Sequence, residues 1–145
     1  MSSFNDAIAQ LVIMLETNPG LVDFAQQSWN KTMTVKPVFK NREEVSLSDL
    51  PIVMITRPRL DPSFEENTVY GGHAVSLYYG FQQNNKELSQ AQIITFEERI
   101  TDALLSDPYL KDTALDVVPG LSVNDEGKFH PVYFGVMAVS ISHKR

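Results

Sequence analysis

Hydrophobic residues recur at helical spacing near the start of the chain, which predicts an amphipathic helix with one apolar face. The apolar face consists of Phe4, Ala7, Ile8, Leu11 and Leu15. Ser3 is placed to cap this helix, and Asp6 lies near the positive end of its dipole. Asn18 is placed to cap a second, shorter helix with Pro19 at its first position. The second helix carries Leu21, Val22, Ala25 and Trp29.

The pattern after this helical segment changes to one typical of β-strands and loops. Thr34–Phe39 contains β-branched and aromatic residues, but Pro37 has no N–H to donate, so we expect an edge strand at best. Asn41–Asp49 is polar and is predicted as a loop. Pro51–Arg57 is a compact apolar run, which predicts a central strand. Arg59–Asn67 contains an Asp-Pro step and two adjacent glutamates, and we expect an exposed loop.

The clearest strand pattern runs from His73 to Gln82, where apolar and small or polar residues alternate. The core face consists of His73, Val75, Leu77, Tyr79 and Phe81. The opposite face is small and polar except for Tyr78. Residues 68–70 are predicted either as a partner strand or as the start of this strand, with Gly71-Gly72 as a bulge or a turn.

A second helical pattern follows the polar loop Gln82–Leu88. The sequence Ser89-x-x-Gln92 matches a capping box, so we expect the helix to begin at Ser89 and to end at Asp107-Pro108. Its apolar face consists of Ile93, Phe96, Ile100, Ala103 and Leu104. Its polar side consists of Glu97, Glu98, Arg99 and Asp102.

The last part of the chain returns to β-strand patterns. Leu115–Val118 is predicted as a short strand that ends at the Pro119-Gly120 step. Residues 122–129 contain Asn-Asp-Glu-Gly and are predicted as a hairpin turn. Val132–Ser142 is the longest predicted strand and is apolar on both faces.

The order of these elements predicts an α+β fold. Strands occur in blocks that one long helix separates, which favours a mostly antiparallel β-sheet with an N-terminal helix and one long central helix packed on one face. A chain of 145 residues with no repeat and no linker is predicted to form a single domain over residues 1–145.

Composition excludes several classes of protein. The chain has no cysteine, which rules out disulfides, a thiol nucleophile and metal sites built on thiolates. The longest apolar run, Leu11–Leu15, is far shorter than the ~20 residues of a membrane helix, and no Lys or Arg precedes it as in a signal peptide. The net charge of −6 disfavours general binding to nucleic acid.

Charge is distributed unevenly along the chain. The segment from Lys31 to Arg59 holds six bases and three acids, whereas the remainder holds six bases and fifteen acids. These values correspond to net charges of +3 and −9. Opposite potentials on one subunit favour head-to-tail contacts between copies, although clustered charges on a solvated face are an equally simple interpretation.

Motifs for catalysis, cofactors and metals are not found in the sequence. The three histidines are scattered, without His-x-His or His-Glu-x-x-His spacing, and no phosphate-binding glycine loop occurs. Paired carboxylates are adjacent in the sequence, so their side chains diverge on a helix or strand. We therefore expect no catalytic, cofactor or metal site. A small hydrolase that uses His73 is the enzymatic alternative.

The layout of the whole chain resembles that of a family of phage proteins. The segments that carry the likeness are Lys36–Phe39, Leu50–Ile55, the helical run 97–104, the Asp-Glu-Gly turn at 125–127 and Val132–Ser142. Together with the N-terminal helix and its Asn-Pro break, they resemble the small tail-terminator (tail-completion) proteins of long-tailed phages and prophages.

This resemblance implies a structural role in the virion, without enzymatic activity. Such proteins form a hexameric ring of identical subunits on the tail tube, end its polymerisation and provide the attachment surface for the head or neck. The implied partners are further copies of the chain, the tail tube protein, a neck or head-completion protein and, in contractile tails, the sheath. DNA passes through the ring without being bound, no membrane is involved, and assembly takes place in the host cytoplasm.

Charge and aromatic residues suggest which side chains form the subunit or tube interface. We expect the basic residues of the +3 segment to face a neighbouring subunit or the tube, namely Lys36, Lys40, Arg42, Arg57 and Arg59. Tyr78, with Trp29 and Tyr70 as further candidates, is predicted as an exposed anchor. The alternatives to a tail terminator are another neck or head-completion connector, the hydrolase, and a monomeric binding module.

Overall fold

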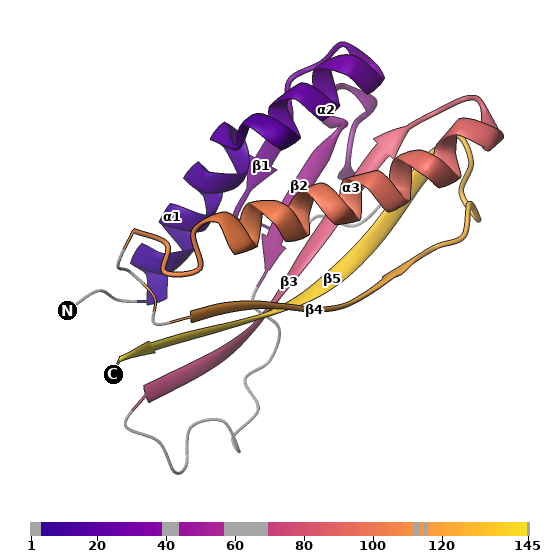
Figure 1. Cartoon of the computed structure of the whole chain (residues 1–145). Coiled ribbons are helices and arrows are strands. Elements are labelled where there is room, and N and C mark those ends of the chain that lie inside the picture. Colours follow the sequence, from indigo (N-terminus) through magenta and orange to yellow (C-terminus); the bar gives the residue numbers. More distant parts are fainter. Residues whose placement is uncertain (1–3, 39–43, 57–69, 112–113, 115, 145) are drawn as a thin grey trace.

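The structure, a computed structural model, describes residues 4–38, 44–56, 70–111, 114 and 116–144. The elements in chain order are α1 (Phe4–Thr17), α2 (Pro19–Trp29), β1 (Thr34–Lys36), the 3-10 helix η2 (Leu47–Asp49), β2 (Ile52–Thr56), β3 (Tyr70–Gln82), α3 (Lys86–Ser106), β4 (Asp116–Asn124) and β5 (Val132–Lys144). Figure 1 shows α1, α2 and α3 together on one face of the sheet.

The five strands form one sheet in the order β1-β2-β3-β5-β4. Three of the four neighbouring pairs are antiparallel, and β1 pairs in parallel with β2. The predicted α+β class, with a mostly antiparallel sheet and helices on one face, is therefore confirmed. β1 and β4 lie at the two edges of this sheet, so each pairs with a neighbour on one side only within the described residues.

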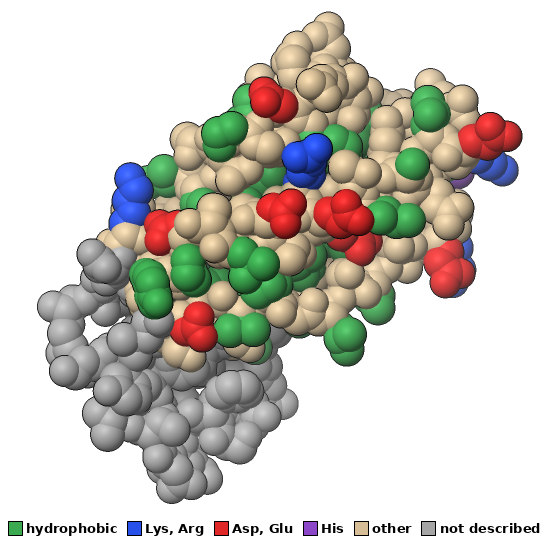
Figure 2. Space-filling view, viewed as in Figure 1, with side chains coloured by type: hydrophobic (Ala, Val, Ile, Leu, Met, Phe, Trp, Pro, Cys, Tyr) green, Lys and Arg blue, Asp and Glu red, His purple; other side chains and the backbone are tan. Residues whose placement is uncertain are grey.

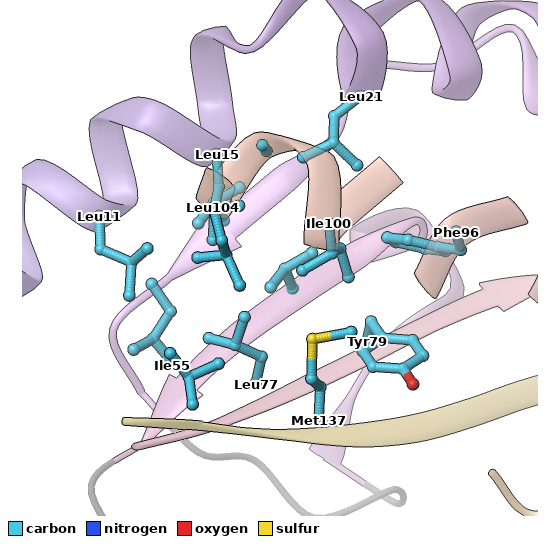
Figure 3. Close-up of a cluster of buried hydrophobic side chains, with 14 of the residues drawn as sticks. Leu11, Leu15, Leu21, Ile55, Leu77, Tyr79, Phe96, Ile100, Leu104 and Met137 are labelled. Atoms are coloured by element: carbon cyan, nitrogen blue, oxygen red, sulfur yellow. The ribbon is translucent and has the colours of Figure 1, made fainter. Parts of the chain in front are cut away.

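The main core lies between the helices and the sheet, and Figure 3 shows part of it. The labelled side chains are Leu11, Leu15, Leu21, Ile55, Leu77, Tyr79, Phe96, Ile100, Leu104 and Met137. They come from α1, α2 and α3 on one side and from β2, β3 and β5 on the other. The predicted apolar stripes of the N-terminal and central helices thus point into one shared core.

Aromatic rings fill the core where α2 and α3 meet the sheet. Trp29 stacks on Phe81 with ring centroids 5.0 Å apart and packs edge-on against Phe24. Its indole N–H donates a hydrogen bond of 3.2 Å to Gln92 on α3. Trp29, a further candidate for an exposed anchor, is half-buried, because its ring packs into this aromatic cluster.

Two glycines on β3 and β5 make room for aromatic rings. Gly135 pairs with Tyr79 and Gly80 pairs with Phe134 in the same antiparallel ladder. A Cβ atom at Gly135 would lie 2.5 Å from the Tyr79 ring, and one at Gly80 would lie 2.6 Å from the Phe134 ring. These two ring–glycine pairs lie on opposite faces of the sheet, and a larger side chain at either glycine would displace a buried ring.

The start of α2 agrees with the sequence, whereas the predicted cap of α1, Ser3, lies outside the described residues. Asn18 caps α2, because its side-chain oxygen accepts a hydrogen bond of 3.2 Å from the backbone N–H of Leu21, and Pro19 occupies the first turn. The predicted apolar face of α2 needs one correction. Val22 is 40% exposed, and Phe24 takes the buried position instead.

The predicted start of the central helix is wrong by three residues. α3 begins at Lys86, and Asn85 caps it by accepting hydrogen bonds from the backbone N–H groups of Glu87 (2.9 Å) and Leu88 (3.3 Å). Ser89 already lies inside the helix, where its hydroxyl donates to the carbonyl of Lys86. The helix ends at Ser106, as its Asp-Pro step predicts.

The C-terminal strands also differ from their predicted boundaries. Pro119-Gly120 does not end a strand, because β4 continues through it to Asn124 with a bulge between Pro119 and Ser122. On β3, Gly71 and Gly72 pair regularly with β5, so residues before His73 are the start of the same strand. The long partner β5 stabilises both extensions because it offers thirteen residues for pairing.

Candidate functional site: the outer face and the β4 edge of the sheet

The predicted interface residues that the structure describes lie on the sheet face opposite the helices, which we call the outer face. Lys36 pairs with Met54, and Met54 pairs with Tyr78, so Lys36 and Tyr78 belong to one row that crosses the sheet. Both side chains are half-buried. The other four basic residues of the prediction fall outside the described residues. These are Lys40, Arg42, Arg57 and Arg59.

The same row continues across β5 to β4. Tyr78 pairs with Val136, which pairs with Val123. Next to this row the outer face carries small side chains. They are Ala74 and Ser76 on β3 and Ala138 and Ser140 on β5. This part of the outer face is therefore flat, which suits it to packing against another surface.

One end of the outer face has a small core of its own. Leu50, Ile52, Met54 and Phe134 are buried there, and Val45 and Tyr78 pack against them. The chain just before β2 therefore covers this end of the sheet. Tyr78 lies at the border of the covered part, so the predicted anchor is a partly covered ring beside the open part of the face.

The β4 edge carries the most exposed hydrophobic side chains of the sheet. Val118 is 50% exposed, Val123 is 64% exposed, and Leu121 is 87% exposed. Leu121 lies in the bulge, where one extra residue on β4 disrupts the pairing and redirects a side chain. The sequence prediction missed these residues because Pro-Gly is the usual signal for a turn. The length of the strand at 132–142 was the available signal, since it requires a partner of similar length.

A groove of about 730 Å³ lies between the start of α3 and the turn that joins β4 to β5. Its lining includes Ile93, Ile94, Val123, Asp125 and Tyr133. The Asp125 carboxylate accepts hydrogen bonds from the backbone N–H groups of Gly127 (3.1 Å) and Phe134 (3.2 Å). This carboxylate thus holds the turn in shape. The groove is lined by polar and charged residues as well as apolar ones, among them Lys86, Gln90 and Glu126.

A buried polar contact joins α3 to β4. Ser122 donates a hydrogen bond of 2.8 Å to Glu97, whose other carboxylate oxygen is buried. The Tyr79 hydroxyl is also buried next to Glu97 and Ser122, but it makes no hydrogen bond of normal geometry with a described residue. Burial raises the pKa of the Tyr79 phenol, and the Glu97 charge raises it further, so the phenol keeps its proton. Glu97, predicted on or near the polar side of the helix, is half-buried there against β4.

Among the described residues, no cluster of three or more His, Asp or Glu side chains that could hold a metal occurs. His130 forms a hydrogen bond with the Tyr133 hydroxyl. His73 lies within β3, where its backbone pairs with that of Ile141. The side chain of His73 is outside the described residues, so the hydrolase alternative stays a prediction.

The helix side of the molecule carries exposed acidic side chains. Figure 2 shows acidic side chains over the helices with few basic ones between them. Exposed acidic residues on α3 include Glu98 and Asp102. The described helices include none with the length and apolar character that a bilayer span requires.

Comparison with known proteins gives no family whose sequence model matches this chain. It also gives no curated protein with significant sequence similarity.

Proposed function

We propose that this chain is a structural assembly protein of a virion, and that it acts as the terminator of a phage tail tube. In this role, copies of the chain form a ring, six in number by the resemblance, on the head-proximal end of the tube. The ring ends polymerisation of the tube and offers a surface to the neck or head. The role needs shape and contacts, and it assigns no reaction and no cofactor to the chain.

One observation carries the proposal: an open sheet edge with exposed apolar side chains. Val118, Leu121 and Val123 lie along β4, and no strand of the described residues pairs with the far side of β4. Unpaired strand edges and exposed apolar groups are features that natural proteins cover when the surface is not used. Their presence here favours a protein that completes its packing against other subunits.

The order of elements supports the more specific assignment to a tail terminator. The layout on which the resemblance rests consists of two N-terminal helices, three strands, a long helix and two strands, and the described fold has this order. The acidic helix side is consistent with a ring through which DNA passes without being held, because like charges repel. Lys36 and Tyr78 remain our candidates for the subunit or tube interface.

The morphology of particles made without this protein tests the assignment. Deletion of its gene from the phage or prophage that encodes it is expected to give tails of uncontrolled, excessive length in electron micrographs. Heads without tails would instead indicate a neck or head-completion connector. Particles of normal form would contradict a role in the virion and would favour the enzyme or the monomeric binding module.

A further inference from the structure

We propose that the β4 edge of one copy pairs with the β1 edge of the next copy, so that the sheet continues from subunit to subunit. The inference rests on the proposed function, since it names the contact by which the copies assemble. Both edges belong to the same sheet, and each pairs on one side only within the described residues. In this arrangement the free edge of β4 is covered by β1 of the next copy, and the free edge of β1 is covered by β4 of the preceding copy.

Strand direction fits this contact. β1 runs parallel to β2, and each later pair along the sheet is antiparallel. β4 consequently runs opposite to β1. When the sheet is repeated in the same orientation, β4 of one copy meets β1 of the next in an antiparallel arrangement, which is the more stable of the two ladder types.

The lengths and faces of the two strands define a register. β1 has three residues, and β4 has four regularly paired residues, 116–119, before its bulge. Val35 and Val117 are both buried on the helix side. Placing Val35 opposite Val117 keeps the helix sides of the two copies on the same side of the joined sheet.

This register puts opposite charges together on the outer face. Lys36 comes to lie opposite the exposed Asp116, and cross-strand pairs of opposite charge stabilise a ladder. The surrounding segments follow the same pattern. Residues 31–38 contain two lysines and no acid, whereas residues 116–126 contain three acids and no base. The two edges are therefore complementary in charge, as a head-to-tail contact between copies requires.

The bulge also gains a function in this arrangement. In the register that places Val35 opposite Val117, and counting the one extra residue of the bulge, Leu121 of one copy lies opposite Thr32 and beside Lys31 of the next copy. Leu121, which is 87% exposed in the single chain, is thus covered by the segment that precedes β1 of the next copy.

Pairing of two β4 edges about a two-fold axis is the competing arrangement, and charge disfavours it. β4 has Asp116 at its start, and Asp125 and Glu126 directly after its end. Antiparallel pairing of two such edges would bring Asp116 of one copy toward the acidic end of the other. Like charges that face each other across strands are destabilising.

Single cysteines test the contact, because the natural chain contains none. We would mix full-length Lys36→Cys and Asp116→Cys chains, distinguished by tags of different length, and oxidise them. Paired strands hold facing Cα atoms ~4.5–5.5 Å apart, within the range of a disulfide. We expect a covalent dimer of one chain of each kind. Asp116→Cys mixed with Asp23→Cys, an exposed position on α2, is the matched control.

The outcomes separate the contact from the proposed function. An assembled wild-type protein without the mixed dimer, or with Asp116→Cys linked to itself as strongly as to Lys36→Cys, would overturn the β4–β1 contact and leave self-assembly intact. A wild-type chain that stays monomeric both alone and with tail tube protein added, and gives no cross-link in any mixture, would overturn both. Yields equal to those of the Asp23→Cys control would also count against the contact.

Charge exchange provides a second test that does not depend on oxidation. Lys36→Asp or Asp116→Lys alone is expected to weaken association by roughly three- to tenfold, since each places like charges together. The double variant, with both charges exchanged in one chain, is expected to recover association. Failure of the double variant to recover, with its circular dichroism unchanged, would overturn the register.

Discussion

At two positions where β3 and β5 pair, an aromatic residue on one strand faces a glycine on the other. Tyr79 fills the space above Gly135 on the helix side, and Phe134 fills the space above Gly80 on the outer face. The arrangement lets two aromatic rings lie flat against neighbouring backbone, so the centre of the sheet is thin and closely packed.

Replacement of Gly135 by alanine tests this packing. The new Cβ would meet the Tyr79 ring at 2.5 Å, so we expect a loss of ~1–3 kcal/mol in the free energy of unfolding. Urea unfolding followed by circular dichroism measures the loss. In a Tyr79→Leu background the same change is expected to cost less, because the smaller side chain can move. Equal costs in both backgrounds would contradict the contact.

The Tyr79 hydroxyl is buried beside Glu97 and Ser122 without a hydrogen bond of normal geometry to either. Removing such a group relieves its desolvation, so Tyr79→Phe is expected to leave the free energy of unfolding unchanged or raise it by up to ~1 kcal/mol. The raised pKa adds a pH dependence. Above pH ~10 the unfolded phenol ionises while the folded one keeps its proton, so stability falls as pH rises.

Urea unfolding of wild type and Tyr79→Phe at about pH 8 and about pH 11 checks both statements, since the interval spans the ordinary tyrosine pKa. The advantage of Tyr79→Phe is expected to grow at the higher pH. The other tyrosines of the chain are common to both proteins and cancel in the comparison. A variant that is less stable than wild type by more than ~1 kcal/mol would show that the hydroxyl has a partner.

At the scale of elements, the start of α3 makes a direct prediction. Asn85 caps the helix, so Asn85→Ala is expected to lower the free energy of unfolding by ~1 kcal/mol. Ser89 lies inside the helix, and Ser89→Ala is expected to cost less than ~0.5 kcal/mol, because alanine is the better helix former. Urea unfolding of both variants decides between them. A larger loss of stability in Ser89→Ala than in Asn85→Ala would contradict this and would indicate that Ser89 caps the helix, as the sequence predicts.

Periodicity was sufficient to predict the elements that bury one face. Ala7, Leu11 and Leu15 of the α1 stripe, the alternating residues from Val75 to Phe81 and the apolar face of α3 appear in the structure as core. The boundaries were less predictable, since Asn85 and Ser89 are both good caps in the sequence. The end of β4 depends on sheet pairing, because pairing with the long strand β5 continues β4 beyond its Pro-Gly step.

The candidate site was predictable in part, and the reason is physical. The alternation along β3 identified a second face with Tyr78 on it, and the structure places Lys36 in the same cross-strand row. Leu121 was not predictable, because its exposure depends on a bulge that forms only when β4 pairs with β5. The small core around Leu50 and Phe134 likewise arises from contacts between distant segments.

For the whole molecule, a substitution at Leu121 distinguishes effects on assembly from effects on folding. Leu121→Asp changes an 87% exposed side chain, so the free energy of unfolding is expected to change by less than ~0.5 kcal/mol. Assembly is expected to weaken, because a charge would be carried into the contact between copies. Light scattering measures the effect, and Ile13→Asp on α1 is the control at another exposed apolar position. Equal assembly in both variants would remove Leu121 from the contact.

The molecule as a whole has two different edges and one face covered by helices. Contacts between unlike patches build rings when the rotation closes and filaments when it does not. A tail terminator requires a closed ring, so the account depends on a defined number of subunits. A monomer, or a polymer of open length, does not satisfy it.

The mass of the full-length protein in solution, measured by light scattering over a wide range of concentration and again with tail tube protein added, tests this most directly. The account predicts a species close to six times the 16.3 kDa mass of one chain, alone or on the tube. A mass that stays at 16.3 kDa under every condition would contradict it.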